Sequence, residues 1–66
     1  MKLHVNGSDM VVADGTDLNT LLCSLGLCET RVAVELNRAI LPKETFQATI
    51  LKEGDVLEIL SFVGGG

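Results

Sequence analysis

The sequence predicts one α+β domain, in which a mixed β-sheet of four to five strands packs on a single helix. Segments with alternating apolar residues stand on both sides of one stretch whose leucines recur at helical spacing. The last segment, residues 56–62, is apolar on both of its faces, which is typical of a central strand. The predicted order is two strands, one helix and three strands. With the final strand at the centre, this order gives a mixed sheet that holds one helix.

A β-hairpin opens the chain. Residues 2–5 alternate polar and apolar side chains, and Asn6-Gly7 is the two-residue turn that best matches the twist of paired strands. Residues 9–13 then form the second strand. A two-residue loop sets His4 opposite Asp9, on the side away from the core. We therefore expect a structural role for His4, since no nucleophile or second base lies near it in the sequence.

One helix follows the hairpin. Either Thr16 or Asp17 can cap its amino-terminal end. Gly26 stands where a left-handed cap is needed at the other end, and Leu27 beyond it can contact the last turn. The apolar residues of the helix share one face: Leu18, Leu21, Leu22 and Leu25. The helix is therefore amphipathic, and the sheet must cover its apolar face.

Two strands and an irregular segment lead to the last strand. Residues 32–36 alternate apolar and polar positions, which predicts a strand with one buried face. Residues 39–41 form a short strand, and the proline that follows removes a hydrogen-bond donor, which indicates a sheet edge. Residues 43–53 show no regular pattern, and Phe46 and Ile50 are their predicted core contacts.

The last strand has one buried and one open face. Its alternation places Glu58, Leu60 and Phe62 together on one side. A glutamate is costly to bury without a partner, so this side is predicted to be the open one. Leu60 and Phe62 then form an exposed apolar patch, a candidate docking surface for another protein. The alternative is that residues 43–53 cover this face.

Composition limits the function classes. A chain of 66 residues is one domain and has no room for a deep active-site cleft. Its net charge of −4 argues against nucleic-acid binding, because neutralising phosphates needs an excess of Lys and Arg. The sequence contains neither an apolar signal core nor a run of about 18 apolar residues. We therefore expect a soluble, cytoplasmic protein without a membrane partner, monomeric when free.

The two cysteines predict no chemistry of their own. Cys23 and Cys28 are five residues apart in a helical stretch, which sets them on separate faces, so we expect reduced core or boundary residues. A catalytic thiol needs a His or cationic neighbour, and the single histidine is distant in sequence. One His and two poorly spaced Cys also do not make a zinc site, so no metal is expected.

The chain ends in three glycines that follow the last strand directly. Glycine gains nothing from packing and loses the most entropy when ordered, so Gly64, Gly65 and Gly66 are not expected to contribute to stability. Without side chains they can enter a channel too narrow for other residues. We therefore predict a domain of residues 1–63 and a flexible tail of residues 64–66, whose working group is the Gly66 carboxylate. The alternative is a frayed end or cloning scar.

Several stretches together resemble the ThiS family, the sulfur carriers of thiamine biosynthesis. They are the Asn6-Gly7 hairpin, the leucine helix, residues 32–37, residues 52–55 and the ending Phe62-Val63-Gly64-Gly65-Gly66. The resemblance covers the whole chain. It implies a ubiquitin-like β-grasp fold and a C-terminal Gly-Gly whose carboxylate is converted to a thiocarboxylate.

The same resemblance implies partners. A ThiF-type enzyme adenylates the carboxylate with ATP, a donor fed by a cysteine desulfurase supplies sulfur and displaces AMP, and thiazole synthase (ThiG) receives the sulfur. By matching position, Gly66 is the modified residue and Gly65 its partner in the motif. The predicted partner-binding residues are Leu60, Phe62, Val63, Gly64 and Gly65. The glycines neither follow a strand-to-helix turn nor carry a lysine, so ATP is expected on the partner, and this chain is a cosubstrate without a bound cofactor.

Other classes stay open at this point. The small subunit of molybdopterin synthase shares this fold and the terminal Gly-Gly, and its tail stays inserted in a large subunit. A ubiquitin-type modifier would instead form an isopeptide bond to a lysine. A non-catalytic interaction module would not need the glycines at all. The short chain and the Phe62-Val63-Gly64 lead-in favour the thiamine carrier by resemblance.

Overall fold

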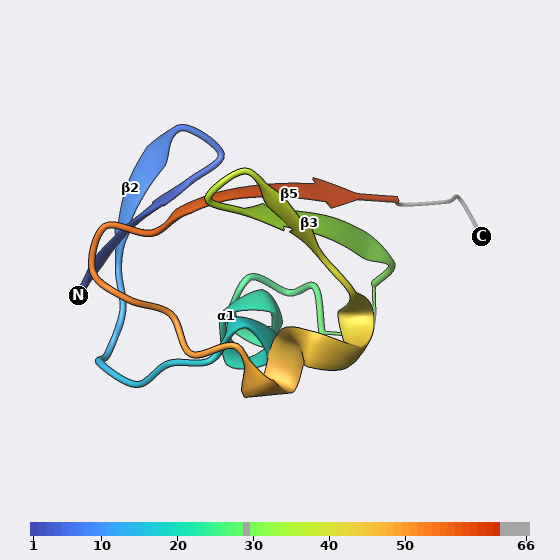
Figure 1. The fold of residues 1–66 in the computed structure, drawn as a ribbon, viewed down its shortest axis with the longest axis horizontal. Helices are drawn as coiled ribbons and strands as arrows, with labels where there is room; N and C mark the ends of the chain where they lie inside the picture. Colours follow the sequence, from blue (N-terminus) through green and yellow to red (C-terminus); the bar gives the residue numbers. More distant parts are fainter. Residues whose placement is uncertain (29, 63–66) are drawn as a thin grey trace.

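A five-stranded mixed sheet covers one face of a helical layer in the computed structural model, which describes residues 1–28 and 30–62. The spatial order of the strands is β2-β1-β5-β3-β4, and Figure 1 shows α1 beneath the sheet. The elements are β1 (Lys2–Val5), β2 (Ser8–Val11), α1 (Leu18–Ser24), β3 (Val32–Leu36), β4 (Ala39–Leu41), the 3₁₀ helix η1 (Lys43–Ala48) and β5 (Val56–Ser61). The predicted α+β order is therefore confirmed.

Strand β5 lies at the centre of the sheet, as its two apolar faces predicted. It pairs in parallel with β1 and antiparallel with β3. The two hairpins, β1 with β2 and β3 with β4, supply the outer strands. The predicted edge position of β4 is confirmed, and β2 forms the other edge. This arrangement places the last described residues of the chain in the middle of the sheet.

The first hairpin has the turn that its sequence predicts. Asn6 and Gly7 both adopt positive φ angles, of 50° and 83°, as the two central residues of a type I′ turn do. The register pairs His4 with Asp9, as expected. Nδ1 of His4 lies 2.7 Å from Oδ1 of Asp9 on the exposed side of the hairpin. His4 thus has the cross-strand contact that the sequence assigns to it.

Helix α1 starts at the cap that the sequence offers. Of the two candidates, Asp17 is the N-cap, since its carboxylate accepts a hydrogen bond of 3.0 Å from the Thr20 N–H. The helix ends at Ser24, and Gly26 takes the left-handed conformation with φ +79°. The Leu27 N–H then bonds to the Leu22 carbonyl, the closing bond of a Schellman motif. The core is made of residues below 6% exposed: Leu3, Leu18, Leu21, Leu22, Val34, Phe46, Leu51 and Leu57.

The cysteines differ from the prediction. Cys23, in the last turn of α1, forms a disulfide with Cys28, and their Cα atoms are 4.0 Å apart. The expectation of two reduced cysteines on separate faces is therefore wrong. That expectation continued the helix through both positions, whereas the helix stops at Ser24 and the turn at Gly26 brings Cys28 back to it.

One predicted core contact is also wrong. Phe46 is buried as expected, but Ile50 is 52% exposed and Leu51 is buried instead. Residues 49–51 pair with the start of α1 through an isolated bridge between Asp17 and Ile50. Because side chains alternate in extended backbone, one of the two neighbours must point outward, and this pairing turns Ile50 out. Among the described residues, no helix is long and apolar enough to cross a membrane.

Candidate functional site

Strand β5 places the last described residues of the chain at the centre of the sheet. At its start it is flanked by β1, and along its length β3 pairs with it from Leu36 opposite Leu57 to Val32 opposite Ser61. Beyond the strand, the Phe62 N–H donates a hydrogen bond of 2.8 Å to the Arg31 carbonyl. Backbone hydrogen bonds therefore hold the chain at the centre of the sheet up to its last described residue, Phe62.

Two asparagine side chains at the hairpin turns form hydrogen bonds with the backbone of β5. The sequence analysis did not predict this role. The Asn6 side chain accepts a hydrogen bond from the Ile59 N–H (2.7 Å) and donates one to the Ile59 carbonyl (3.1 Å). The Asn37 side chain likewise accepts a bond of 2.9 Å from the Val56 N–H. The signal in the sequence was an asparagine at each hairpin turn, and both were interpreted only as turn residues.

The face of the sheet opposite the helix is open. Figure 1 shows η1 beside α1 on the other side of the sheet, so residues 43–53 do not cover this face and that alternative is wrong. Leu60 is 61% exposed and Phe62 is 51% exposed. Both side chains are thus free to meet a partner, while their docking role stays a prediction.

Alternation and register define the rest of this face. The residues that share it on the three strands β5, β3 and β4 are Val56, Glu58, Leu60, Ala33, Glu35 and Ile40. We call this set, together with Phe62, the open face. Glu35 and Glu58 are direct register partners at its centre. Two hollows lie on this face, and both glutamates line each of them. The open face is therefore an apolar surface with an acidic centre.

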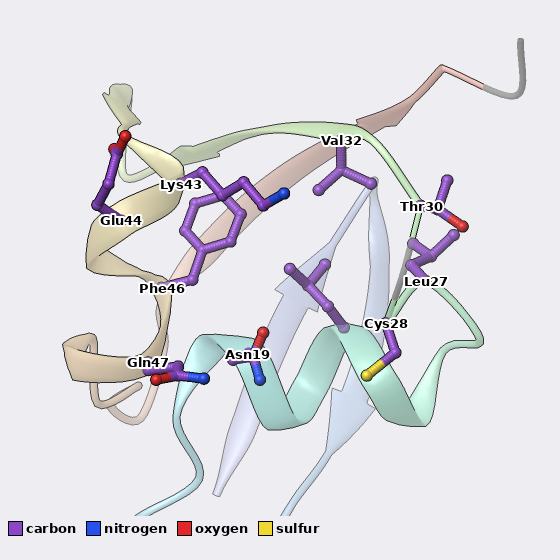
Figure 2. A pocket seen from close by; sticks show the side chains of 10 residues that line it. Asn19, Leu27, Cys28, Thr30, Val32, Lys43, Glu44, Phe46 and Gln47 are labelled. Atoms are coloured by element: carbon purple, nitrogen blue, oxygen red, sulfur yellow. The ribbon is translucent and has the colours of Figure 1, made fainter.

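A further hollow lies in the helical layer, between α1 and η1 (Figure 2). Its apolar lining residues include Leu22, Val32 and Phe46, and the polar ones include Lys43, Glu44 and Gln47. Cys28 also lines it, but its sulfur is bonded to Cys23. Lys43 and Glu44 both line this hollow, but no ion pair joins them among the described residues, and the only sulfur of the lining is in the disulfide, so the geometry indicates no catalytic centre.

Two carboxylates have pKa values below their ordinary range. The hydrogen bond with His4 is the main cause that lowers the pKa of Asp9, and the charge of Lys2 assists. The hydrogen bonds that Thr20 donates lower the pKa of Asp17. Both groups have structural explanations, a cross-strand pair and a helix cap. Within the described part of the chain, no cluster of residues is suited to holding a metal ion.

The remaining predicted site residues are not among the residues that the structure describes. Val63, Gly64, Gly65 and Gly66 are not among the described residues, so the structure gives them no position. Of the predicted partner-binding residues, Leu60 and Phe62 are brought together on the open face. The glycines and their carboxylate continue from there in sequence, directly after the central strand.

Comparison with known proteins identifies relatives along the whole chain. The ThiS family matches residues 3–66. The sulfur carrier protein ThiS of Bacillus subtilis is 40% identical over 65 residues, which cover 97% of this chain and 98% of that protein. A thiazole synthase of Magnetococcus marinus is 42% identical over 66 residues, all of this chain but 20% of that enzyme's length. The chain thus spans one fifth of the thiazole synthases it matches.

A solved structure supports the same relationship. The crystal structure of the thiamine biosynthesis protein ThiS from Geobacter metallireducens superposes with a TM-score of 0.83 at 42% identity, covering 100% of both chains. Its likeness extends over the complete β-grasp fold. The matched family, the full-length relative and the fold agree, and the chain belongs to the ThiS family, the sulfur carrier proteins of thiamine biosynthesis.

Proposed function

We propose that this chain carries sulfur as a thiocarboxylate on Gly66 and donates it for formation of the thiazole ring of thiamine. The observation that carries the proposal is the course of β5, which runs through the centre of the sheet to Ser61, with only Phe62 and Val63 between it and the terminal glycines in the sequence. The family match extends to residue 66 and so includes those glycines. In this proposal residues 1–63 present the tail, and residues 64–66 deliver it.

The chemistry explains why an activating partner is needed. An α-carboxyl group with a pKa of about 3.3–3.7 is ionised at neutral pH, and a carboxylate is a poor electrophile. Attack of the Gly66 carboxylate on ATP forms an acyl adenylate and releases pyrophosphate. A persulfide sulfur of the donor then attacks the acyl carbon and AMP leaves, which gives an acyl disulfide. A second thiol attacks the donor's sulfur of that S–S bond, forms a disulfide with the donor and releases the thiocarboxylate. Glycine at the reacting position offers the least steric obstruction.

The partners follow from the same steps. A ThiF-type enzyme would bind ATP and the tail, and a donor fed by a cysteine desulfurase would supply the sulfur. Thiazole synthase, ThiG, would receive it. Support for the last partner comes from thiazole synthases that include a segment similar to this whole chain. We infer that such an enzyme is a partner of this chain, that no cofactor is bound to the chain itself, and that the exchange takes place in the cytoplasm.

The open face is the proposed docking surface for the activating partner. Leu60 and Phe62 would pack on the partner while Val63, Gly64 and Gly65 pass into its channel. Burial of such exposed apolar side chains favours association by roughly 25 cal/mol per Å² of apolar surface. Leu60 lies in β5 and Phe62 just beyond it, close in sequence to the glycines. A partner that binds these two side chains would therefore also direct Gly66 to its adenylation site.

The intact mass of the protein tests the proposal. The chain is incubated with ATP, a ThiF-type enzyme and the sulfur donor, and its mass is compared before and after. We expect an increase equal to the replacement of one oxygen by sulfur, and no increase when Gly66 is deleted. An unchanged mass under conditions where a Bacillus subtilis ThiS control gains sulfur would refute the carrier function.

A further inference from the structure

We propose that the open face recognises its activating partner through an arginine of that partner, which is received between Glu35 and Glu58. This inference rests on the proposed function and adds to it the feature that selects the partner. The occupant is a protein surface with one cationic side chain surrounded by apolar ones. The two glutamates supply the specificity, and the apolar residues around them supply contact area.

The two glutamates are directly opposite each other on the central strands. Glu35 on β3 and Glu58 on β5 are register partners in an antiparallel pair, and alternation turns both to the open face. Side chains in such pairs start about 4.5–5.5 Å apart at Cβ, and two like charges in this position repel each other. The pair therefore does not serve the stability of the free protein.

No cation within the described residues neutralises this pair. The ion pairs found there join the N-terminus to Asp14 and join Lys2 and His4 to Asp9. Of the positive groups on the β1–β2 side of the sheet, Lys2 is thus paired with Asp9 of its own hairpin, and the N-terminus is paired with Asp14. Arg38 lines one hollow together with both glutamates, yet it forms no ion pair with either among the described contacts.

Exposed apolar side chains surround the acidic pair. Ile40, the register partner of Glu35 on its other side, is 78% exposed. Val56 and Leu60 stand one pleat before and one pleat after Glu58, and both are also exposed. A partner that covers these apolar groups must also cover the two carboxylates between them.

This arrangement determines the charge of the partner. Removing two carboxylates from water without compensation is strongly unfavourable, so an apolar surface alone cannot cover the open face. A cation that contacts both carboxylates compensates them and relieves their repulsion. A guanidinium fits best, because its planar fork can donate hydrogen bonds to two carboxylates at once and it is more weakly hydrated than an ammonium.

The test compares affinity with stability in charge-neutral variants. Glu58→Gln and Glu35→Gln keep the size of the side chain and remove one charge each. The matched control is Glu44→Gln, which removes the same charge from η1 on the helical side of the molecule. The Kd for the ThiF-type enzyme is measured by titration at low and at high salt, and the Tm of each free variant is measured by thermal unfolding.

We expect Glu58→Gln and Glu35→Gln to weaken binding roughly fivefold or more at low salt, and less at high salt. Their Tm should equal or exceed that of the wild type, because the repulsion is removed, and Glu44→Gln should bind as the wild type does. The inference is overturned if both open-face variants bind like Glu44→Gln, or if their weaker binding is accompanied by a matching loss of Tm.

A second measurement separates this inference from the proposed function. Deletion of Gly66 should leave docking through the open face intact while abolishing the mass gain. At saturating enzyme, Glu58→Gln should still be converted, since its tail is unchanged. If the wild type gains no sulfur, the carrier function fails. If the wild type is converted and the glutamine variants bind normally, the arginine site alone fails.

Discussion

At the scale of single residues, asparagines at the two hairpin tips do more than form turns. Asn6 and Asn37 both have a φ of 50°, in the left-handed region that asparagine tolerates better than most residues. This conformation turns each side-chain amide towards β5, where it bonds to the backbone of Ile59 or Val56. The strand that presents the tail is thereby held at its start and near its middle by side chains from other segments.

Replacement of Asn6 tests how much its hydrogen bonds to β5 stabilise the protein. Asn6→Ala removes both hydrogen bonds to Ile59 and places a residue with a Cβ but no local hydrogen bonding at positive φ. At about 0.5–1.5 kcal/mol for each bond, we expect the free energy of unfolding to fall by about 1–3 kcal/mol. Asn6→Asp should have an intermediate effect, because it keeps the acceptor and loses the donor. Chemical denaturation measures both; wild-type stability in Asn6→Ala would contradict the role.

Phe62 is the last described residue and directly follows β5. Its side chain is exposed and its N–H is bonded to Arg31, so the ring is available for a partner while the backbone is held. We expect Phe62→Ala to weaken activation by the ThiF-type enzyme more than it lowers thermal stability. Adenylation kinetics and thermal unfolding of the same variant measure the two effects. Equal losses would mean that Phe62 acts as a core residue.

At the scale of elements, helix α1 is short and depends on its two ends. It has 7 residues, which is too few for a helix that is stable by itself in water. Asp17 caps its start, and at its end the Gly26 turn and the Cys23–Cys28 disulfide return the chain towards β3. Its buried leucines then pack beneath β5.

The cap predicts a pH dependence. The hydrogen bonds from Thr20 hold the pKa of Asp17 below its ordinary value of 3.8, so folding favours the ionised carboxylate. The stabilisation is therefore present above pH 3.8 and is lost as the pH falls through the lower pKa of the folded state. Asp17→Asn can still accept a bond but cannot ionise, so its Tm should depend less on pH across this range. Asp9 titrates in both proteins, so the difference between them isolates Asp17. Parallel Tm curves would contradict this account.

The disulfide predicts a stability that depends on reductant. Closing a loop of this length contributes about 2 kcal/mol in the chain-entropy model. Without reductant, Cys23→Ser should therefore unfold at a lower denaturant concentration than the wild type. With a dithiol reductant, the two proteins should unfold alike, because both then lack the bond. Alkylation and intact mass verify the thiol state, and a difference that persists after full reduction would show that Cys23 contributes by packing instead.

At the scale of the whole molecule, the two sides of the sheet have different roles. The helical layer, α1 with η1, buries one side of the sheet and supplies four of the eight buried core residues, Leu18, Leu21, Leu22 and Phe46. The other side carries the open face, whose apolar residues and glutamates need not support the fold. Strand β5 belongs to both, because Leu57 is in the core while Glu58 and Leu60 face outward. One strand thus contributes both to the core and to the proposed docking surface.

Local chemistry explains what the sequence alone could predict. Asn6-Gly7 selects the hairpin turn, the leucine spacing and Gly26 define the helix and its end, and the two apolar faces of residues 56–62 place the last strand at the centre. Each of these properties depends on neighbouring residues or on the alternation within one segment. The glycine tail was predicted in the same way and stays a prediction, since Gly64–Gly66 are not among the described residues.

The tertiary structure decided what depends on the alignment of distant segments. The bridge between Asp17 and Ile50 turned Leu51 rather than Ile50 into the core. The turn after α1 brought the two cysteines together, which spacing along a continued helix could not show. The register of β3 on β5 set Glu35 opposite Glu58. Strand register is fixed by burial on one face and by turn geometry, and a shift of one residue would reverse every side chain, so spacing within a single segment does not contain this information.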